Sequence, residues 1–212
     1  MATLIAGVRL PDSALAREAD ELVRDTAPRL LFDHSRRVFL FGSLQGRRLG
    51  RVANPELLYV GAMFHDLGLT ERYRQSMQRF ELDGADEARR FLAARGIDED
   101  SVRKVWTGIA LHTTPEVPYG LEPEVALVLA GVETDVVGRN LDGLRKDDIA
   151  EVTAAHPRPD FKRQILAAFA EGVRHRPDST FGTMNADVLA HFVPGFQRPD
   201  LVEAVLGNPW PQ

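Results

Sequence analysis

Apolar residues recur at intervals of three and four positions along most of the chain, which is the pattern of helices with one buried face. Caps, prolines and glycines divide the pattern into segments: Asn54 and Pro55 begin a helix, for example, and Gly138 ends one. The segments predict ten helices, at about residues 12–25, 28–50, 54–68, 85–95, 98–114, 123–138, 147–155, 159–174, 185–192 and 199–206. No stretch shows the sustained alternation of a strand, so the sequence predicts an all-α bundle.

Polar residues interrupt several of these apolar faces. His34 lies on the predicted buried face of the second helix, His112 on that of the fifth and Asp135 on that of the sixth. An adjacent pair, His65 and Asp66, ends the third predicted helix on its inward side. The apolar positions that share these faces are Leu31, Val38, Phe41, Val102, Val105, Ile109, Val125, Val128 and Val132.

Each of these polar residues also has a purely structural interpretation. A single buried histidine is more often a hydrogen-bonded core residue than a metal ligand. Asp135 could cap the turn at residues 136–138. Together, however, His34, His65, Asp66 and Asp135 bring two imidazoles and two carboxylates into one interior, where unpaired carboxylates would be costly to bury. The set therefore predicts a site for Zn²⁺, Fe²⁺ or Mn²⁺, with open positions for water and substrate.

Length and composition are those of an ordinary globular domain. Of the 212 residues 44% are hydrophobic and 27% charged, and we expect one domain over residues 1–212. Within it we expect a metal-binding core at about 28–140 and a C-terminal helical extension at about 145–212. The net charge of −5 argues against a dedicated nucleic-acid-binding protein. No apolar run approaches about 18 residues, no signal-peptide pattern is present and cysteine is absent, so we expect a cytoplasmic protein without a membrane span.

Several common catalytic motifs do not occur in the sequence. It has no glycine-rich phosphate loop, no Gly-x-Ser-x-Gly elbow and no HExxH pair, which excludes P-loop enzymes, serine hydrolases of the elbow type and zincins. The lack of cysteine excludes thiolate nucleophiles and Cys-ligated zinc. The histidine and carboxylate set is therefore the strongest candidate for chemistry.

The order of these residues resembles a known family. His34, the pair His65 and Asp66, and then Asp135 follow one another as in the HD-domain superfamily of metal-dependent hydrolases, an all-α fold named for its His-Asp pair. The segments FDHSRRVFLFG, LLYVGAMFHDLGLTERY and RFELDGADEARRFL are similar to the cyanamide hydratase-like branch. The resemblance covers about residues 28–140, with a weaker match at FGTMNADVL. It implies an HD-domain helical bundle with additional C-terminal helices.

The resemblance also implies roles for individual residues. It implies that His34, His65, Asp66 and Asp135 bind one divalent transition metal, with zinc or iron expected first and manganese as the alternative. It further implies that Asp66 orients or deprotonates the attacking water. Some dinuclear members have two additional histidines before the last aspartate, whereas this chain has only His112, so we expect a mononuclear centre. We expect His112 to shuttle a proton or contact substrate; a fifth ligand and a structural hydrogen bond are the alternatives.

By this resemblance the first functional hypothesis is a hydratase or hydrolase that activates water against a small polar substrate similar to cyanamide or a nitrile. The alternative is a phosphohydrolase for a nucleotide or another small phosphate ester, and a non-catalytic metal-binding module comes third. Phosphoryl transfer needs cations around the phosphate. Arg37, one turn after His34, is the best-placed candidate to bind such a substrate, and the others are Arg36, Arg72, Arg74 and Arg79.

The expected partner is a small-molecule substrate, with no nucleic acid and no membrane. The last predicted helix carries apolar residues that would pack either on the core or on a second subunit. The second case would make the protein a homo-oligomer; the residues concerned are Leu201, Val205 and Leu206.

Overall fold

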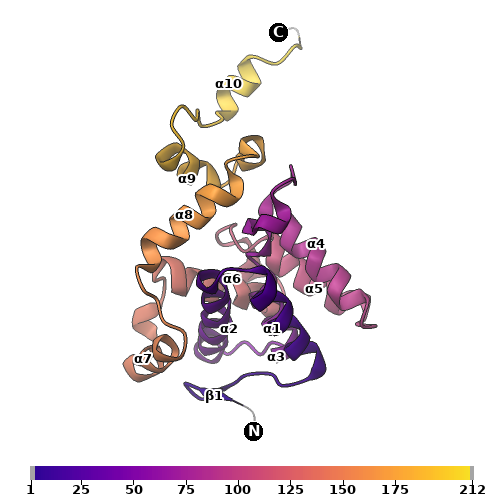
Figure 1. The fold of residues 1–212 in the computed structure, drawn as a ribbon, viewed down its shortest axis with the longest axis vertical. Helices are drawn as coiled ribbons and strands as arrows, with labels where there is room; N and C mark the ends of the chain where they lie inside the picture. The colour runs from indigo at the N-terminus through magenta and orange to yellow at the C-terminus, as the bar shows by residue number, and fades with distance from the viewer. Residues whose placement is uncertain (1–2, 211–212) are drawn as a thin grey trace.

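The computed structural model describes residues 3–210, in which the chain forms ten α-helices, five short 3₁₀ helices and one two-stranded hairpin (Figure 1). The α-helices are α1 (Ala14–Thr26), α2 (Arg29–Leu49), α3 (Pro55–Phe64), α4 (Phe80–Ala93), α5 (Glu99–Ala110), α6 (Pro123–Val137), α7 (Lys146–Ala155), α8 (Phe161–Val173), α9 (Asn185–Phe192) and α10 (Leu201–Leu206). The remaining elements are β1 (Leu4–Ile5), β2 (Val8–Arg9), η1 (Leu67–Leu69), η2 (Glu71–Tyr73), η3 (Val117–Gly120), η4 (Leu141–Gly143) and η5 (Pro177–Thr180). The all-α prediction is confirmed, and none of the helices within residues 3–210 has both the length and the apolar character to cross a membrane.

All ten predicted helices are present, but three boundaries near the polar residues differ. Helix α3 ends at residue 64 rather than 68, because the chain tightens into the 3₁₀ turn η1. Helix α5 ends two residues before His112, which therefore lies in the following turn and not on the helix. Helix α4 begins at residue 80 rather than 85. Its first turn buries the charged residues Glu81 and Asp83, so the spacing of apolar residues did not predict that turn. The hairpin has two residues per strand, which is too short to produce alternation.

Helices α2 and α6 form the central pair of the bundle (Figure 1). They touch at two glycines: a Cβ at Gly42 would lie 2.5 Å from a backbone carbonyl oxygen of α6, and one at Gly131 would lie 2.1 Å from the carbonyl oxygen of Val38. Any larger residue at these points would push the helices apart. Asp135 lies one turn after Gly131, and His34 lies one turn before Val38, so the close approach also brings these two side chains together.

The other helices surround this pair and divide the apolar interior into two parts. Helices α1 and α3 pack on one another, α4 packs on α5, and α5 packs on α6. Their side chains form one large apolar cluster with those of α2 and α6. A second, smaller cluster joins α8 and α9 to the start of α2, η1 and the start of α4, and consists of Leu31, Leu69, Phe80, Phe161, Ile165, Val173 and Leu189. The C-terminal extension therefore packs on the bundle through apolar contacts of its own.

A buried arginine also joins the C-terminal extension to the bundle. Arg176 has 0% exposure and donates hydrogen bonds to the carbonyl oxygens of Gly68 at 2.6 Å and Gln78 at 2.8 Å. It also forms an ion pair with Asp83, whose carboxylate is buried. Gly68 belongs to η1, which directly follows Asp66. The extension thus helps to fix the turn that carries one of the predicted ligands.

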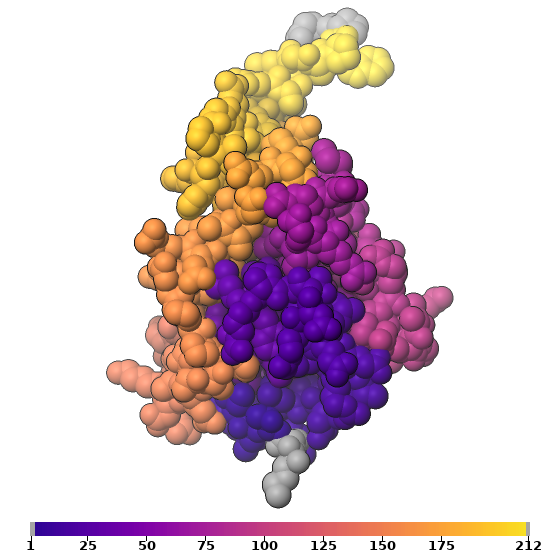
Figure 2. Space-filling model, viewed as in Figure 1, coloured from indigo at the N-terminus to yellow at the C-terminus, as the bar shows by residue number. Residues whose placement is uncertain are grey.

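Helix α10 projects from the C-terminal end of the molecule (Figure 2). Leu201, Val205 and Leu206 are 64%, 56% and 73% exposed, so the expectation that they pack on the core is wrong. Cover by a second subunit stays a prediction.

The glycine contact between α2 and α6 gives the first prediction. We expect Gly131→Ala to lower the free energy of unfolding by about 3 kcal/mol, because the new methyl group would overlap the carbonyl oxygen of Val38. For a chain of this size that corresponds to a loss of about 6–12 °C in Tm, which thermal denaturation measures. Gly120→Ala is the matched control, since its Cβ meets no atom within 4 Å, and we expect a change within about 0.5 kcal/mol. Equal effects of the two variants would refute the tight helix contact.

Candidate metal centre

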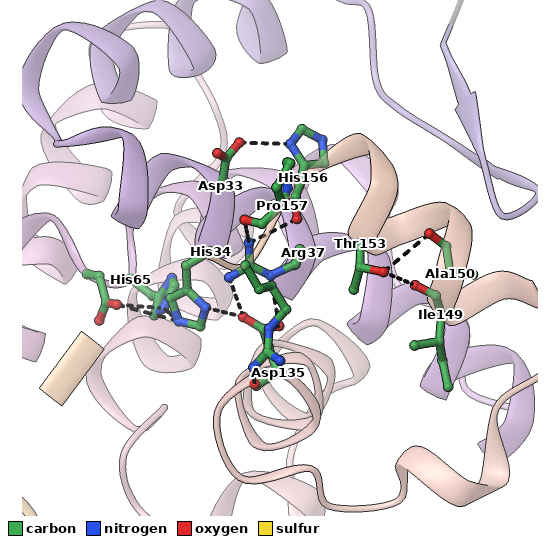
Figure 3. Close-up of polar contacts among 12 residues, drawn as sticks. Asp33, His34, Arg37, His65, Asp135, Ile149, Ala150, Thr153, His156 and Pro157 are labelled. Atoms are coloured by element: carbon green, nitrogen blue, oxygen red, sulfur yellow. Dashed lines mark hydrogen bonds and ion pairs between the residues drawn. The ribbon is translucent and has the colours of Figure 1, made fainter. Parts of the chain in front are cut away.

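The predicted site residues come from four separate elements and meet in the interior. His34 lies on α2, His65 caps the end of α3 with Asp66 directly after it, and Asp135 lies near the end of α6. His112 lies in the turn after α5. All five are buried, with exposures between 0% and 3%. Figure 3 shows His34 between His65 and Asp135, with Arg37 against the carboxylate of Asp135.

Three of these residues form a compact group that could hold a metal ion. His34, His65 and Asp66 each offer one ligand atom, and the three atoms lie within 4.8 Å of one another. The Nε2 atoms of His34 and His65 are 3.2 Å apart, and the Oδ2 atom of Asp66 lies 3.6 Å and 3.3 Å from them. We call this group the triad.

Backbone hydrogen bonds set the tautomers of two histidines. The Nδ1 atom of His65 lies 2.7 Å from the carbonyl oxygen of Ala62, and the Nδ1 atom of His112 lies 2.6 Å from that of Ile109. A carbonyl oxygen can only accept a hydrogen bond, so each Nδ1 carries a proton, and each ring presents a lone pair at Nε2 whenever it is neutral. These lone pairs point to the side where Asp66 lies.

The carboxylate of Asp66 needs a cation. Within the described residues neither of its oxygens has a hydrogen-bond partner, although both are buried. Burial by itself would raise the pKa of Asp66, but the charge of His65 and the neighbouring imidazoles outweigh it and hold the pKa well below its usual range. Likewise, burial would lower the pKa of His65, and Asp66 raises it. Both shifts have one cause, which is that the carboxylate stabilises positive charge at this point.

His34 is better suited to bind a cation than to carry a proton. Burial lowers its pKa, and the hydrogen bond to Asp135 offsets this only in part. A neutral imidazole keeps the Nε2 lone pair that a metal ion requires. Lone pairs 3.2 Å apart on His34 and His65 repel one another unless a positive charge lies beside them. The unpaired Asp66 and these two rings together fit a divalent metal ion.

His112 lies beside the triad, on the other oxygen of Asp66. Its Nε2 atom is 3.6 Å from Oδ1 of Asp66, and within the described residues it has no hydrogen-bond partner. The ring packs edge-on against His65 and Phe80, with ring centres 4.9 Å and 5.5 Å away. His112 is therefore close enough to act on a molecule bound at Asp66, although it is not part of the compact group.

Asp135 lies behind His34, on the far side of the imidazole from the triad. Its Oδ2 atom accepts a hydrogen bond from Nδ1 of His34 at 2.6 Å (Figure 3). Arg37 donates to both carboxylate oxygens, at 2.8 Å and 2.9 Å, and Arg158 forms an ion pair at 3.1 Å. Burial would raise the pKa of Asp135, but these partners lower it to about 2. The structure brings Asp135 to His34 and not to the triad.

The contacts of Arg37 do not fit the substrate-binding role predicted for it. The side chain has 0% exposure, and besides Asp135 it donates to the carbonyl oxygens of His156 and Pro157, both at 3.1 Å. Its guanidinium group also lies over the ring of Phe161, 4.7 Å from the ring centre. Helical spacing placed Arg37 correctly on the face of His34. Its guanidinium N–H groups, however, donate to other residues of the protein and not to a substrate. Arg37 supports Asp135.

The sequence pattern missed the residues that the C-terminal extension adds to the site. Arg158 pairs with Asp135, and Phe161 packs 5.4 Å from the ring of His34. Glu81, fully buried, accepts hydrogen bonds from Arg79 and Asn185 close to His112. The pattern assigned neither Glu81 nor Arg158 a role: Glu81 lies on α4 within the segment RFELDGADEARRFL, and the half-buried Arg158 lies in the segment before α8. Their contacts with distant residues were the missing information. With Phe80 and Phe161 over the imidazoles, the second apolar cluster closes the site from solvent.

The pairing of Arg37 with Asp135 gives the second prediction. We expect Arg37→Ala to lower the free energy of unfolding by about 3–5 kcal/mol, because it leaves a buried carboxylate without its main partner. Arg29→Ala on the same helix is the control: its side chain is 75% exposed and pairs with Asp33, so the loss should be at most about 1 kcal/mol. Urea denaturation of both variants measures the difference. A loss for Arg37→Ala no larger than the control would contradict the supporting role.

A comparison with protein families agrees with this geometry. The family model described as HD domain matches residues 31–189, which is most of the chain and includes the triad, His112 and Asp135. The match continues past residue 140 through α9, so it takes in much of the C-terminal extension. No curated protein matches the chain. The buried His-Asp pair, the all-α bundle and the family match lead to one conclusion: the chain belongs to the HD domain family, whose members are typically metal-dependent hydrolases.

Proposed function

We propose that this protein is a metal-dependent hydratase or hydrolase that activates water at the triad against a small, uncharged substrate similar to cyanamide or a nitrile. The observation that carries the proposal is the convergence of unpaired ligand atoms in a closed interior. Among the described residues the buried oxygens of Asp66 have no hydrogen-bond partner, and the Nε2 atoms of His34 and His65 lie 3.2 Å from one another beside them.

The donor set limits the metal to a few candidates. Two imidazoles and one carboxylate suit zinc, iron or manganese, and one such ion per chain is what we propose, with zinc or iron first. Bound there, a divalent ion lowers the pKa of a coordinated water and polarises the group under attack.

Asp66 and His112 supply the proton transfers. One oxygen of Asp66 faces the two histidines of the triad and the other faces His112. A water held at Asp66 would therefore lie within reach of both Asp66 and His112. In the tautomer fixed by Ile109, His112 presents a lone pair and must first accept a proton. It can then return that proton to the atom that gains charge. For a cyano group, the water oxygen adds to carbon and the nitrogen receives one proton, which gives the imidic acid. Transfer of the remaining proton from oxygen to nitrogen then gives the amide.

The surroundings of the triad support a neutral substrate. Phe80 and Phe161 lie against the imidazoles, and the second apolar cluster covers them. Addition of water to a cyano carbon develops charge on a single nitrogen, which one metal and one proton donor can stabilise. The segments around the triad resemble the cyanamide hydratase-like branch, and this resemblance supports the choice of a cyano substrate.

The arginines on which the phosphohydrolase alternative relied are paired with carboxylates of the chain. Phosphoryl transfer spreads charge over several oxygens and needs positive groups around them. Each arginine that the sequence offered for this purpose forms an ion pair with a carboxylate of the chain, at 2.8–3.0 Å: Arg36 with Asp20, Arg37 with Asp135, Arg72 with Glu87, Arg74 with Glu71 and Arg79 with Glu81.

The proposal predicts that the purified protein carries about one transition metal per chain. His65→Ala should remove the metal and abolish turnover, because it deletes one of three ligands. His191→Ala, at an exposed position on α9, is the matched control and should change neither. Elemental analysis measures the metal content, and assays with cyanamide, nitriles and deoxynucleotides measure the turnover. Full activity of the wild type after chelation would refute metal dependence, and efficient phosphate release would favour the alternative.

The role of His112 gives a separate prediction. His112→Gln should keep the metal and lower turnover by about 10²–10⁴, the usual contribution of general acid–base catalysis. His175→Gln, a half-buried histidine that contacts the carbonyl oxygen of Ser76, is the control and should leave turnover unchanged. Loss of the metal from His112→Gln would make His112 a ligand, and unchanged turnover would make it structural.

A further inference from the structure

The carboxylate of Asp135 accepts most of its hydrogen bonds from groups of the protein itself. A carboxylate offers about four lone-pair sites. Three hydrogen bonds reach it: Oδ1 accepts one from Nε of Arg37 at 2.8 Å, and Oδ2 accepts one from Nη2 of Arg37 at 2.9 Å and one from Nδ1 of His34 at 2.6 Å. Nε of Arg158 adds an ion pair at 3.1 Å to Oδ1 without a hydrogen bond. The two oxygens of Asp66, by contrast, have no hydrogen-bond partner in the described part of the chain. The carboxylate of Asp135 thus accepts three hydrogen bonds, and that of Asp66 accepts none.

The charges around the two aspartates differ in the same way. Two guanidinium groups lie against Asp135, so a divalent cation drawn to it would approach two fixed positive charges in a buried region. The groups that face Asp66 within ion-pair distance are the imidazoles of His34, His65 and His112. An imidazole nitrogen can itself bind a metal ion, whereas a guanidinium group is always charged and cannot, which makes Asp66 the favourable position.

Asp135 is placed to orient His34. It accepts the Nδ1 proton of the imidazole, which leaves Nε2 with its lone pair, and Nε2 lies 3.2 Å from Nε2 of His65 (Figure 3). A carboxylate behind a ligating histidine fixes the tautomer and ring orientation and raises the basicity of the ligand. The imidazole itself separates Asp135 from the position where the metal would lie.

From this geometry we propose that the chain holds its metal through three protein ligands, His34, His65 and Asp66, and that Asp135 is a positioning residue that orients His34. The proposal rests on the proposed metal-dependent function. It departs from the four-ligand pattern that the resemblance implied, because Arg37 and Arg158 occupy the carboxylate that would have been the fourth ligand. Three protein ligands leave more positions for water and substrate than four would.

The same contacts connect the metal centre to the C-terminal extension. Arg37 donates to the carbonyl oxygens of His156 and Pro157, and Arg158 belongs to the same short segment between α7 and α8. Residues 156–158 therefore hold both arginines against Asp135, and through it they hold His34. The orientation of a metal ligand on α2 depends on a segment more than a hundred positions away.

The ligand assignment is tested by making the same replacement, aspartate to asparagine, at each of two positions. Asp66→Asn and Asp135→Asn both replace a carboxylate by an isosteric amide, and zinc affinity is measured for each full-length protein by competition with a chelator. Asp66→Asn removes a ligand, so we expect its zinc Kd to rise by more than about 100-fold. In Asp135→Asn the amide oxygen can still accept the proton of His34, so we expect a rise of about 10–100-fold, the range for groups that act behind a ligand. An equal or larger loss in Asp135→Asn would overturn the proposal.

The cobalt-loaded protein gives a second readout that does not depend on activity. The visible absorption of Co²⁺ reports the number and type of its ligands. We expect the spectrum of Asp135→Asn to match that of the wild type and that of Asp66→Asn to differ from it. A changed spectrum in Asp135→Asn, with the spectrum of Asp66→Asn unchanged, would reverse the two roles.

A third variant covers the possibility that Asp135→Asn fails to fold, since it leaves Arg37 buried without a charged partner. Arg37→Met combined with Asp135→Asn removes both charges, and circular dichroism of the metal-free proteins shows which variants are folded. The proposal predicts that this double variant still binds zinc more tightly than Asp66→Asn, and the reverse order would overturn it. If the wild type binds no metal at all, the proposed function fails, which is a different result from failure of the ligand assignment.

Discussion

The close approach of α2 and α6 is the constraint on which the site depends. At Gly42 and Gly131 each helix presents its backbone to the other, and a single added carbon at either point would meet a carbonyl oxygen. This contact sets His34 and Asp135 at hydrogen-bonding distance, and His34 in turn places its free nitrogen against His65. Backbone packing of two helices therefore decides the geometry of the ligand atoms.

Burial gives the site its chemical character. The two buried aspartates of the site have different surroundings: the carboxylate of Asp135 lies between two guanidinium groups, and that of Asp66 lies among imidazoles. The first arrangement neutralises a buried carboxylate within the protein, and the second leaves a buried carboxylate for an external cation. Membership of the HD domain family is consistent with this division, because a metal-dependent reaction requires one open carboxylate in a closed interior.

Much of the fold was predictable because helix signals are local. Caps, prolines and the three-four spacing of apolar residues predicted all ten helices and the all-α class. The boundaries failed where tertiary contacts override local preference. Helix α4 starts early because Glu81 and Asp83 are buried by partners from distant segments, and α3 stops early where Arg176 binds the carbonyl oxygen of Gly68.

The sequence by itself determined which residues face the interior and, through their order, which family the chain belongs to. Helical periodicity placed His34, Asp135 and Arg37 on buried faces, because a helix repeats its faces whatever it packs against. Only the tertiary structure decided which of these groups meet. The distance from His34 to Asp135, the pairing of Arg37 and the entry of Arg158 from the C-terminal extension depend on contacts between segments that lie far apart along the chain, and no local pattern records them.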